Sequence, residues 1–447
     1  MSTPKVGRAK RSLEQWLAYQ TAVHPQAIDL GLDRLREVLN RLGWQQPAVP
    51  VITVAGTNGK GSVSGYCAAI MAAAGLRVGT FTSPHLRDYR ERVRVHDRLA
   101  SADELVSAFE RIEAARATVG LTFFEFNTLA ALLVFDAAQL DVWVLEIGMG
   151  GRLDAVNVVD PDVAVVVSIG LDHQEYLGTT LEAIGREKAG IFRRGRPAVL
   201  GSNDMPAVVE ETARKVGAPL KRLGKEYAYA HEGAIWHFRG SRWNLPQLPP
   251  PALMGEAQYA NAATAIAALE EIDARLAIPA AAVARGLREV DLVARFQVIV
   301  PTASPGPTWI LDVAHNPAAA RVLARNLRDH PSAGRTLGVC GILADKDAAA
   351  VVAELRDCID AWWCVTTDGE RGRSGASLAR MIEEKVAAPV QAADSVSAGC
   401  TAALANAKPF DRVVVFGSFH VVGPALNWLE ANDLLPPAAL PEYTAAP

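Results

Sequence analysis

The sequence predicts an α/β protein with two domains. The larger domain is expected to contain a mostly parallel sheet with a P-loop, and a smaller Rossmann-like α/β domain follows it. Short apolar runs typical of buried strands alternate with longer segments of helical periodicity, as in βαβ units. A glycine-rich turn follows the first such run, and the α/β pattern starts again near residue 294. Because 447 residues exceed one ordinary core, we expect domains at 1–293 and 294–447.

The expected elements of the first domain follow one another in alternating order. The first fifty residues place apolar side chains at helical spacing, for example Leu32, Leu35 and Val38. The predicted strands are residues 51–55, 78–82, 142–146 and 163–168. The predicted helices include one that ends near residue 74 and two more at 102–117 and 125–138.

The pattern of apolar and polar residues changes before the second domain begins. Alternating residues at 227–240 predict a β-hairpin that turns near 232–233. A proline-rich connector is expected at 245–255, followed by an alanine-rich helix at 258–274. The strands expected in the second domain are residues 309–312, 337–341, 362–365 and 413–416.

Composition excludes several classes of protein. The net charge of -4 and the absence of a basic stripe argue against nucleic-acid binding. No uncharged apolar stretch is long enough to span a membrane, and the N-terminus lacks the apolar segment of a secretory signal. Five widely spaced cysteines without a CxxC pair indicate reduced thiols in the cytoplasm. No heptad pattern stands out, so we expect a monomer.

The glycine-rich turn after residues 51–55 predicts a phosphate-binding loop. Its sequence is Gly56-Thr57-Asn58-Gly59-Lys60-Gly61-Ser62, and a helix follows. Glycines let backbone N–H groups face phosphate oxygens, and the helix dipole favours an anion. Lys60 adds a positive charge for the β- and γ-phosphates. Val54 replaces the usual first glycine and Gly61 separates Lys60 from Ser62, which indicates a particular subclass of nucleotide-binding loop.

Three polar residues stand at or just after the ends of predicted strands: Ser83, Glu146 and His173. ATP chemistry requires Mg²⁺, which prefers oxygen ligands, and an acid after a parallel strand can reach a bound metal. Taken singly, each residue also has a plainer interpretation. Ser83 fits a turn before Pro84, Glu146 fits a helix cap or surface ion pair, and His173 fits a loop histidine.

Six further motifs occur in a characteristic order along the chain. They are TSPHL at 82–86, EIGMGGRLDA at 146–155, SIGLDH at 168–173, REKAGI at 186–191, NAATA at 261–265 and LDVAHNP at 311–317. Together with the GTNGKGS loop, they resemble the Mur ligase superfamily. Over almost the whole chain they are similar to its folylpolyglutamate synthase branch, and specifically to the bifunctional bacterial dihydrofolate synthase/folylpolyglutamate synthases.

The resemblance implies a set of functional residues in addition to the loop. Magnesium ligands are implied at Ser83, Glu146 and His173, with Lys188 as a further ligand once CO₂ has carbamylated it. Catalytic roles are implied for Lys60, Lys188, His173 and His315. The implied cofactors are Mg²⁺, with two ions, and a monovalent cation, while ATP is a co-substrate.

The resemblance also implies nucleotide contacts at Asn261, Arg295 and Asp312. Asn261 is predicted to open a helix, where capping is its alternative role. Arg295 lies at the predicted domain junction, and Asp312 ends a strand of the second domain. The family usually has glycine before this arginine, whereas this chain has Ala294, which reduces the backbone freedom of the junction.

Three patches are implied to line a pterin pocket, as in bifunctional members of the family. They are Asp29-Leu30-Gly31, Thr122-Phe123-Phe124-Glu125 and Leu153-Asp154-Ala155. A phenylalanine would stack on the flat pterin and an acid would accept its ring N–H groups. Ordinary core packing is the alternative role of each phenylalanine.

The expected activity is ATP-dependent joining of L-glutamate to dihydropteroate, and of further glutamates to reduced folates, through an acyl phosphate. Alternatives are a folylpolyglutamate synthase only, or a ligase that adds an amino acid to a muramyl precursor. A catalytically silent scaffold is disfavoured because every expected catalytic residue is present. A plain P-loop hydrolase would turn over ATP without glutamate.

Overall fold

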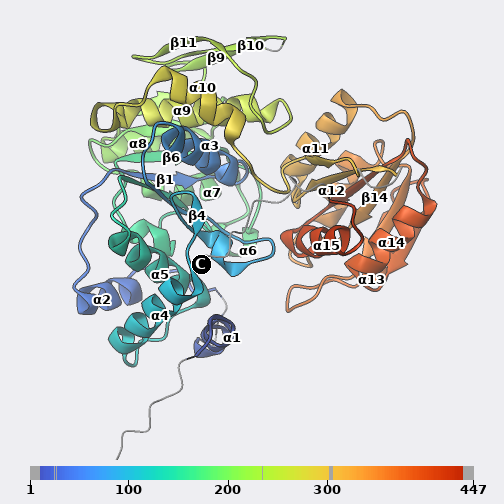
Figure 1. Ribbon diagram of the computed structural model, residues 1–447, viewed down its shortest axis with the longest axis horizontal. Helices are drawn as coiled ribbons and strands as arrows, with labels where there is room; N and C mark the ends of the chain where they lie inside the picture. Colours follow the sequence, from blue (N-terminus) through green and yellow to red (C-terminus); the bar gives the residue numbers. More distant parts are fainter. Residues whose placement is uncertain (1–10, 25, 27, 234, 302–305, 436–447) are drawn as a thin grey trace, which may run out of the picture.

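Two α/β domains lie side by side in the computed structural model, which describes residues 11–24, 26, 28–233, 235–301 and 306–435 (Figure 1). The N-terminal domain contains an eight-stranded sheet of order β4-β3-β2-β5-β1-β6-β7-β8, and the C-terminal domain a six-stranded sheet of order β12-β13-β17-β14-β15-β16. A small three-stranded sheet, β11-β10-β9, lies beyond α9 and α10 at the top of Figure 1. The predicted fold class is therefore confirmed.

The large sheet is parallel except at one edge, where β2, β3 and β4 pair antiparallel. Its strands are β1 Val51–Ala55, β2 Val78–Phe81, β3 Val93–Val95, β4 Arg98–Leu99, β5 Val142–Glu146, β6 Val163–Val166, β7 Ala198–Leu200 and β8 Leu220–Arg222. Every residue of β1 and β5 is buried, as expected for strands covered on both faces. The short strands β3, β4, β7 and β8 were not predicted, because two to three residues carry too little periodic signal.

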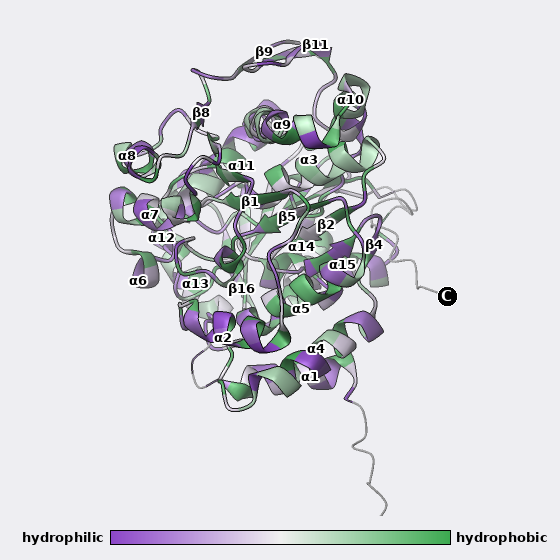
Figure 2. Ribbon diagram, turned by 90° about the vertical axis from the view of Figure 1, so that its left-hand side faces the viewer, coloured by the Kyte–Doolittle hydropathy of each residue, from purple (hydrophilic) through white to green (hydrophobic). Residues whose placement is uncertain are grey.

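Helices cover both faces of this sheet. The helices of the N-terminal domain are α1 Leu13–Val23, α2 Asp33–Leu42, α3 Lys60–Ala73, α4 Ala102–Arg116, α5 Phe123–Ala137, α6 Gln174–Leu177, α7 Leu181–Lys188, α8 Ala207–Val216, α9 Ala257–Leu276 and α10 Ala280–Glu289. Successive side chains of β5 point to opposite faces, so Val144 packs with α3, α9 and α10 whereas Leu145 packs with α4 and α5. Figure 2 shows the hydrophobic strands β1, β5 and β2 between these layers.

One predicted segment differs in the structure. Residues 245–255 were expected to form a proline-rich connector, but Asn244–Leu248 is strand β11, paired antiparallel with β10 Ile235–Arg239. Because β11 is an edge strand, it tolerates Pro246, which cannot donate a backbone hydrogen bond. The predicted hairpin is confirmed as β9 Ala228–Glu232 and β10.

The C-terminal domain is a second, mostly parallel α/β layer structure. Its strands are β12 Gln297–Ile299, β13 Thr308–Asp312, β14 Thr336–Cys340, β15 Ala361–Val365, β16 Val390–Ala393 and β17 Arg412–Phe416. Its helices are α11 Pro317–Asp329, α12 Ala348–Leu355, α13 Gly375–Glu383, α14 Val396–Asn406 and α15 Phe419–Ala431. The four predicted strands are confirmed, whereas the edge strands β12 and β16 were missed.

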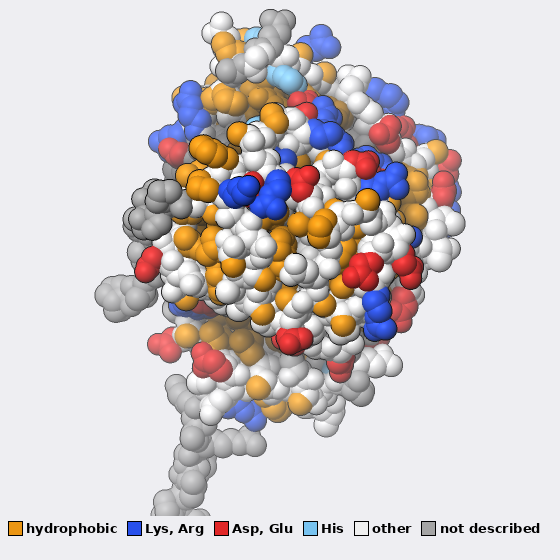
Figure 3. Space-filling model, turned by 90° about the vertical axis from the view of Figure 1, so that its right-hand side faces the viewer, with side chains coloured by type: hydrophobic (Ala, Val, Ile, Leu, Met, Phe, Trp, Pro, Cys, Tyr) orange, Lys and Arg blue, Asp and Glu red, His pale blue; other side chains and the backbone are white. Residues whose placement is uncertain are grey.

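The outer face of the C-terminal domain has no concentrated charge in the view of Figure 3, where basic and acidic side chains are interspersed with hydrophobic ones. Among the helices that the structure describes, none combines the length and the hydrophobicity that a membrane span requires.

Candidate active site

The carboxyl ends of the central parallel strands bring the predicted site residues together. Strand β1 pairs with β5 and β6, and β5 pairs with β2, so the loops after these four strands meet at one edge of the sheet. This edge faces the C-terminal domain, and several contacts cross between them. Ligands of open α/β sheets bind at such an edge.

The glycine-rich loop joins β1 to the start of α3. Gly59 has φ +85° at the N-cap of α3, a left-handed conformation that favours glycine. Asn58 N–H donates to Ser168 Oγ at 3.0 Å, which ties the loop to the segment after β6. Lys60 Nζ donates to the carbonyls of Gly56 and Thr57 at 3.1 and 3.3 Å. The loop thus presents a helix N-terminus and a lysine at the sheet edge, as a phosphate site requires.

Asn261 lies beside this loop, but its position within its helix differs from the prediction. The prediction that Asn261 opens a helix is wrong, because α9 begins at Ala257 and Asn261 is its fifth residue. A Cβ atom on Gly59 would lie only 2.7 Å from Asn261 Oδ1. The side chain of Asn261 therefore packs directly against the phosphate-binding loop, and its capping role is excluded.

Glu146, at the end of β5, is a buried carboxylate with 4% exposure. Its Oε2 accepts the backbone N–H of Ser83 at 3.4 Å, so two predicted magnesium ligands are neighbours. Burial raises the pKa of Glu146, while the charges of Lys60 and Arg295 oppose that rise. Binding a cation would stabilise the ionised form of this carboxylate.

Lys188 ends α7 and is not a solvated lysine. It is buried, with 4% exposure, and its Nζ donates to the carbonyl of Gly56 in the phosphate-binding loop at 3.0 Å. Burial lowers the pKa of Lys188 from 10.5 to about 7, and the charge of Lys60 adds to this effect. A large share of its amine is therefore neutral at pH 7, which is the form that reacts with CO₂.

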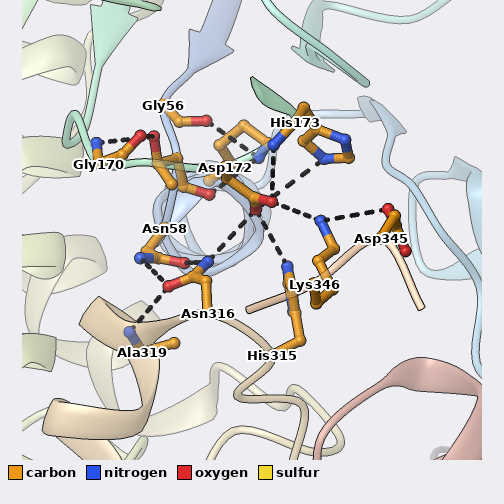
Figure 4. A network of polar contacts seen from close by, with 12 residues as sticks. Gly56, Asn58, Gly170, Asp172, His173, His315, Asn316, Ala319, Asp345 and Lys346 are labelled. Atoms are coloured by element: carbon orange, nitrogen blue, oxygen red, sulfur yellow. Dashed lines mark hydrogen bonds and ion pairs between the residues drawn. The ribbon is translucent and has the colours of Figure 1, made fainter. Parts of the chain in front are cut away.

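Asp172 is the centre of a polar network between the two domains (Figure 4). Its carboxylate forms an ion pair with Lys346 and accepts from His315 Nε2 at 3.3 Å and Asn316 Nδ2 at 3.3 Å. The side chains of Asp172 and Lys346 are only 8% and 7% exposed. Burial alone would raise the pKa of Asp172, but the bond and charge of His315 and the charge of Lys346 lower it well below the ordinary value. Asp172 is thus ionised at neutral pH and joins the domains.

A second bridge in Figure 4 reaches the phosphate-binding loop. Asn58 and Asn316 exchange two side-chain hydrogen bonds of 3.1 and 3.0 Å. Asn316 also caps α11 by accepting the N–H of Ala319 at 3.0 Å. The loop of the first domain is therefore coupled to the first turn of α11 in the second.

His173 is the N-cap residue of α6 and follows Asp172 in the chain. Burial lowers the pKa of His173 to about 4; the charge of Asp172 opposes this shift, while the charges of Lys346, Lys60 and Lys188 add to it. The imidazole is therefore neutral at pH 7, which is the form that binds a metal.

The predicted residues of the domain junction lie at the same edge. Asp312 accepts the N–H groups of Phe296 and Ala314 at 2.9 and 2.8 Å, which holds the strand end next to Arg295. A Cβ atom on Gly61 would lie 3.2 Å from Arg295 Nη2. Arg295 thus reaches the phosphate-binding loop from the junction.

The donor set suits magnesium better than a softer metal. Across the part of the chain that the structure describes, no three His, Cys, Asp or Glu residues cluster as metal ligands do. Glu146 and Ser83 nevertheless supply oxygen donors side by side, and oxygen is what Mg²⁺ prefers. Mg²⁺ also keeps several waters, so it needs few protein ligands.

The first two patches of the predicted pterin pocket are joined by Arg34. Its Nη1 contacts Asp29 Oδ2 at 2.6 Å and its Nε donates to Glu125 Oε1 at 3.1 Å. Glu125 also forms a capping box with Thr122, whose N–H it accepts at 2.7 Å. The carboxylate of Glu125 is therefore already bonded to Arg34 and to the backbone of Thr122. Arg34 itself was not identified from the sequence.

The second and third patches also meet. Phe124 packs on the backbone of Gly148, where a Cβ atom would lie 2.5 Å from its ring. Asp154 is buried and accepts the N–H groups of Met149 and Val156 at 2.8 and 3.0 Å. Burial raises the pKa of Asp154 to about 7. Phe123 and Phe124 are half-buried rather than fully enclosed in the core.

Sequence reasoning missed four residues of this site: Arg34, Asp172, Asn316 and Lys346. Asp172 lies inside a recognised motif next to His173, so its position alone was a usable signal. Lys346 lies 174 residues after Asp172 along the chain, and no local pattern could have paired them.

Comparison with known proteins finds two family models that match the chain. Residues 54–269 match the Mur ligase middle domain, and residues 294–419 match the Mur ligase glutamate ligase domain. The Escherichia coli dihydrofolate synthase/folylpolyglutamate synthase is 42% identical over 97% of this chain and 99% of its own. The Haemophilus influenzae protein of the same name is 39% identical over 93% of this chain and 97% of its own.

Solved structures are similar over the same extent. The structure of E. coli FolC in complex with DHPP and ADP has a TM-score of 0.89 at 42% identity, covering 96% of this chain and 100% of that one. A bifunctional folylpolyglutamate synthase/dihydrofolate synthase with Mn, AMPPNP and L-glutamate bound has a TM-score of 0.86 at 42% identity, with the same coverage. On these similarities, the chain belongs to the Mur ligase family, within its dihydrofolate synthase/folylpolyglutamate synthase branch.

Proposed function

We propose that this protein joins L-glutamate to dihydropteroate to make dihydrofolate, and adds further glutamates to tetrahydrofolate, using ATP. One observation carries the proposal. The phosphate-binding loop, the buried Glu146 and Lys188, and Arg295 and His315 from the junction and second domain converge on one sheet edge. The bifunctional relatives, one of them solved with Mn, AMPPNP and L-glutamate, support the same activity.

The chemistry requires activation of the acceptor. A carboxylate does not condense with an amine in water because its oxygen is a poor leaving group. Transfer of the γ-phosphoryl group of ATP to the acceptor carboxylate gives an acyl phosphate and ADP. The amine of glutamate then attacks the acyl carbon, and the products are the amide and phosphate.

The residues of the chain have separate parts in this reaction. Lys60 and the backbone amides of its loop stabilise the negative charge on the transferred phosphoryl group. Arg295 approaches the same loop from the domain junction, and Asn261 contacts it from α9. When bound, Mg²⁺ neutralises charge on the phosphates, and Ser83, Glu146, His173 and carbamylated Lys188 are its proposed ligands.

Closure of the two domains completes the site. Asp172 joins the first domain to Lys346, His315 and Asn316 of the second. We place glutamate at this junction, where His315 is held by Asp172. Closure there positions the substrates and excludes water that would hydrolyse the acyl phosphate.

The acceptor is proposed to bind among the three patches of the predicted pterin pocket. The three patches connected by Arg34 and Gly148 supply a half-buried ring, Phe124, and a partly exposed acid, Asp29. Asp154 holds the third patch through its bonds to Met149 and Val156. We also propose that the protein acts as a monomer with a domain boundary at residue 294, two magnesium ions and a monovalent cation. Its five free cysteines favour the cytoplasm.

The test is ADP release by the purified protein with ATP, Mg²⁺ and L-glutamate. Separate reactions receive dihydropteroate, tetrahydrofolate or a UDP-muramyl acceptor. We expect release with the first two, a loss of about 100-fold or more in Lys60→Ala, and no loss in the exposed control Lys215→Ala. Release with tetrahydrofolate alone would leave a folylpolyglutamate synthase, and release with the muramyl acceptor alone would overturn the proposal.

A further inference from the structure

One face of α15 lies against the N-terminal domain. Phe419, Gly423 and Glu430 are spaced four and seven residues apart, which places them within about 40° of one another around the helix. Phe419 lies beside Arg295 of the domain junction, and Gly423 and Glu430 lie beside the loop after β2. In Figure 1, α15 lies on the side of its domain that faces the first domain.

The central contact is between Gly423 and the loop that carries Ser83. A Cβ atom on Gly423 would lie 2.2 Å from the carbonyl oxygen of Leu86 and 3.2 Å from its carbonyl carbon. These are backbone atoms, so no side-chain rotation could relieve the clash. The side chain of Leu86 also packs against the hydrophobic core that contains Val421 and Leu426. The loop is thus seated on α15 by both its backbone and its side chain.

Two further contacts flank Gly423. The guanidinium of Arg295 lies 5.6 Å from the centre of the Phe419 ring, a cation–π distance. At the other end of the helix, Glu430 forms an ion pair with Arg87, the residue after Leu86. The face of α15 therefore holds both the arginine of the junction and the loop after β2.

The loop after β2 is held together by hydrogen bonds to the side chain of Glu91. Glu91 accepts the backbone N–H groups of Leu86, Arg87 and Asp88 at 2.7, 3.0 and 2.8 Å. Ser83, three residues before Leu86, donates its N–H to Glu146 at 3.4 Å. Displacement of Leu86 would therefore move Ser83 relative to Glu146.

We propose that this face of α15 is a docking seat and that Gly423 is a positioning residue for the reaction. The seat holds the Ser83–Glu146 pair and Arg295 in their working geometry only while the C-terminal domain is docked. This inference rests on the proposed function and adds to it a physical link between domain docking and the metal site.

The test is Gly423→Ala in the full-length protein. If Gly423 only allowed the two domains to pack closely, the clash with Leu86 would lower stability, but the folded protein would keep its kcat and its Mg²⁺ dependence. The docking seat instead predicts a fall in kcat of about 100-fold, as for a small misplacement of catalytic groups. The Mg²⁺ concentration for half-maximal activity should rise as well. Asn427→Ala, exposed on the same helix, is the matched control and should retain wild-type kinetics.

A charge exchange provides the second test. Arg87→Glu and Glu430→Arg should each lower activity about two- to fivefold, and the double variant should recover it. Wild-type kcat and Mg²⁺ dependence in Gly423→Ala, or no recovery in the double variant, would overturn the proposal.

Small-angle scattering separates this proposal from the proposed function. If the wild-type protein releases no ADP with any folate acceptor, the proposed function fails. The seat still predicts a larger radius of gyration for Gly423→Ala than for the wild type with AMPPNP and Mg²⁺. Equal radii would overturn the seat independently.

Discussion

Replacing Lys188 by methionine should stabilise the protein while abolishing its activity. Methionine keeps much of the length of the side chain but carries no charge. In the wild type, burial and the charge of Lys60 lower the pKa of Lys188 from 10.5 to about 7. At about 1.4 kcal/mol per pH unit, the difference between 10.5 and 7 corresponds to about 5 kcal/mol. About 4 kcal/mol of this stability is lost at pH 7, because the amine of the folded protein is still half protonated there.

The gain in the variant is smaller than that figure. Lys188 donates a 3.0 Å hydrogen bond to the carbonyl of Gly56, and loss of this donor costs about 1–3 kcal/mol. The net expectation is a free energy of unfolding about 2 kcal/mol higher than that of the wild type at pH 7. Activity should be lost because the proposed carbamate has no nitrogen on which to form.

The pH dependence has a definite sign. The pKa of Lys188 in the folded protein lies below its value in the unfolded chain. Between about pH 7 and 10.5 the unfolded chain therefore binds a proton that the folded chain does not, so wild-type stability rises with pH. The methionine variant lacks this contribution, and its advantage should shrink between pH 7 and pH 9.

Scanning calorimetry in CO₂-free buffer at pH 7 and pH 9 measures both effects. The transition of the N-terminal domain should rise by about 4 °C in the variant at pH 7. Lys215→Met, at an exposed position on α8, is the control and should change little. A destabilised Lys188→Met, or an advantage that does not shrink with pH, would refute the reasoning. Bicarbonate should stabilise only proteins that retain Lys188.

Three further predictions follow from single contacts. Ala294 has φ +62° and is buried, so Ala294→Gly removes about 1 kcal/mol of left-handed strain but loses a buried methyl group worth about 0.8 kcal/mol. The calorimetric stability should change by less than about 1 kcal/mol, whereas Ala294→Val should lose more than about 2 kcal/mol; equal losses would contradict this. Lys346→Met removes the lysine that pairs with the buried Asp172 carboxylate. Loss of this partner should weaken docking of the two domains by about 3 kcal/mol. The scattering profile of this variant should show separated domains, and an unchanged profile would count against the network as the link. Phe124→Ala should raise KM for dihydropteroate about tenfold while KM for ATP stays constant, as steady-state kinetics with varied acceptor will show.

Much of the fold could be predicted because it depends on local patterns. Strands such as Val51–Ala55 are continuous apolar runs, and the turn after this strand is marked by glycine. Thr122 and Glu125 have the spacing of a capping box, a signal that the sequence analysis did not use, and the structure engages both residues in that cap. The role of Glu125 in binding substrate stays a prediction.

The candidate site could be predicted only in part. The sequence indicated Lys60, Glu146 and Lys188, but it did not distinguish a solvated lysine from a buried one. Burial of Lys188 against Gly56, 132 residues away, is what lowers its pKa.

The sequence by itself determined the order of the longer buried strands and the helices between them, the phosphate-binding loop and the motifs that identify the family. Only the tertiary structure decided how the two domains meet. Asp172 and Lys346 are paired by packing across the domain junction, and Leu86 rests on Gly423 for the same reason. The periodicity of apolar residues indicates which side chains of a helix or strand share a face. It does not indicate which other helix, strand or loop, distant in the sequence, packs on that face. That choice depends on the shape and charge of surfaces that exist only after each domain has folded.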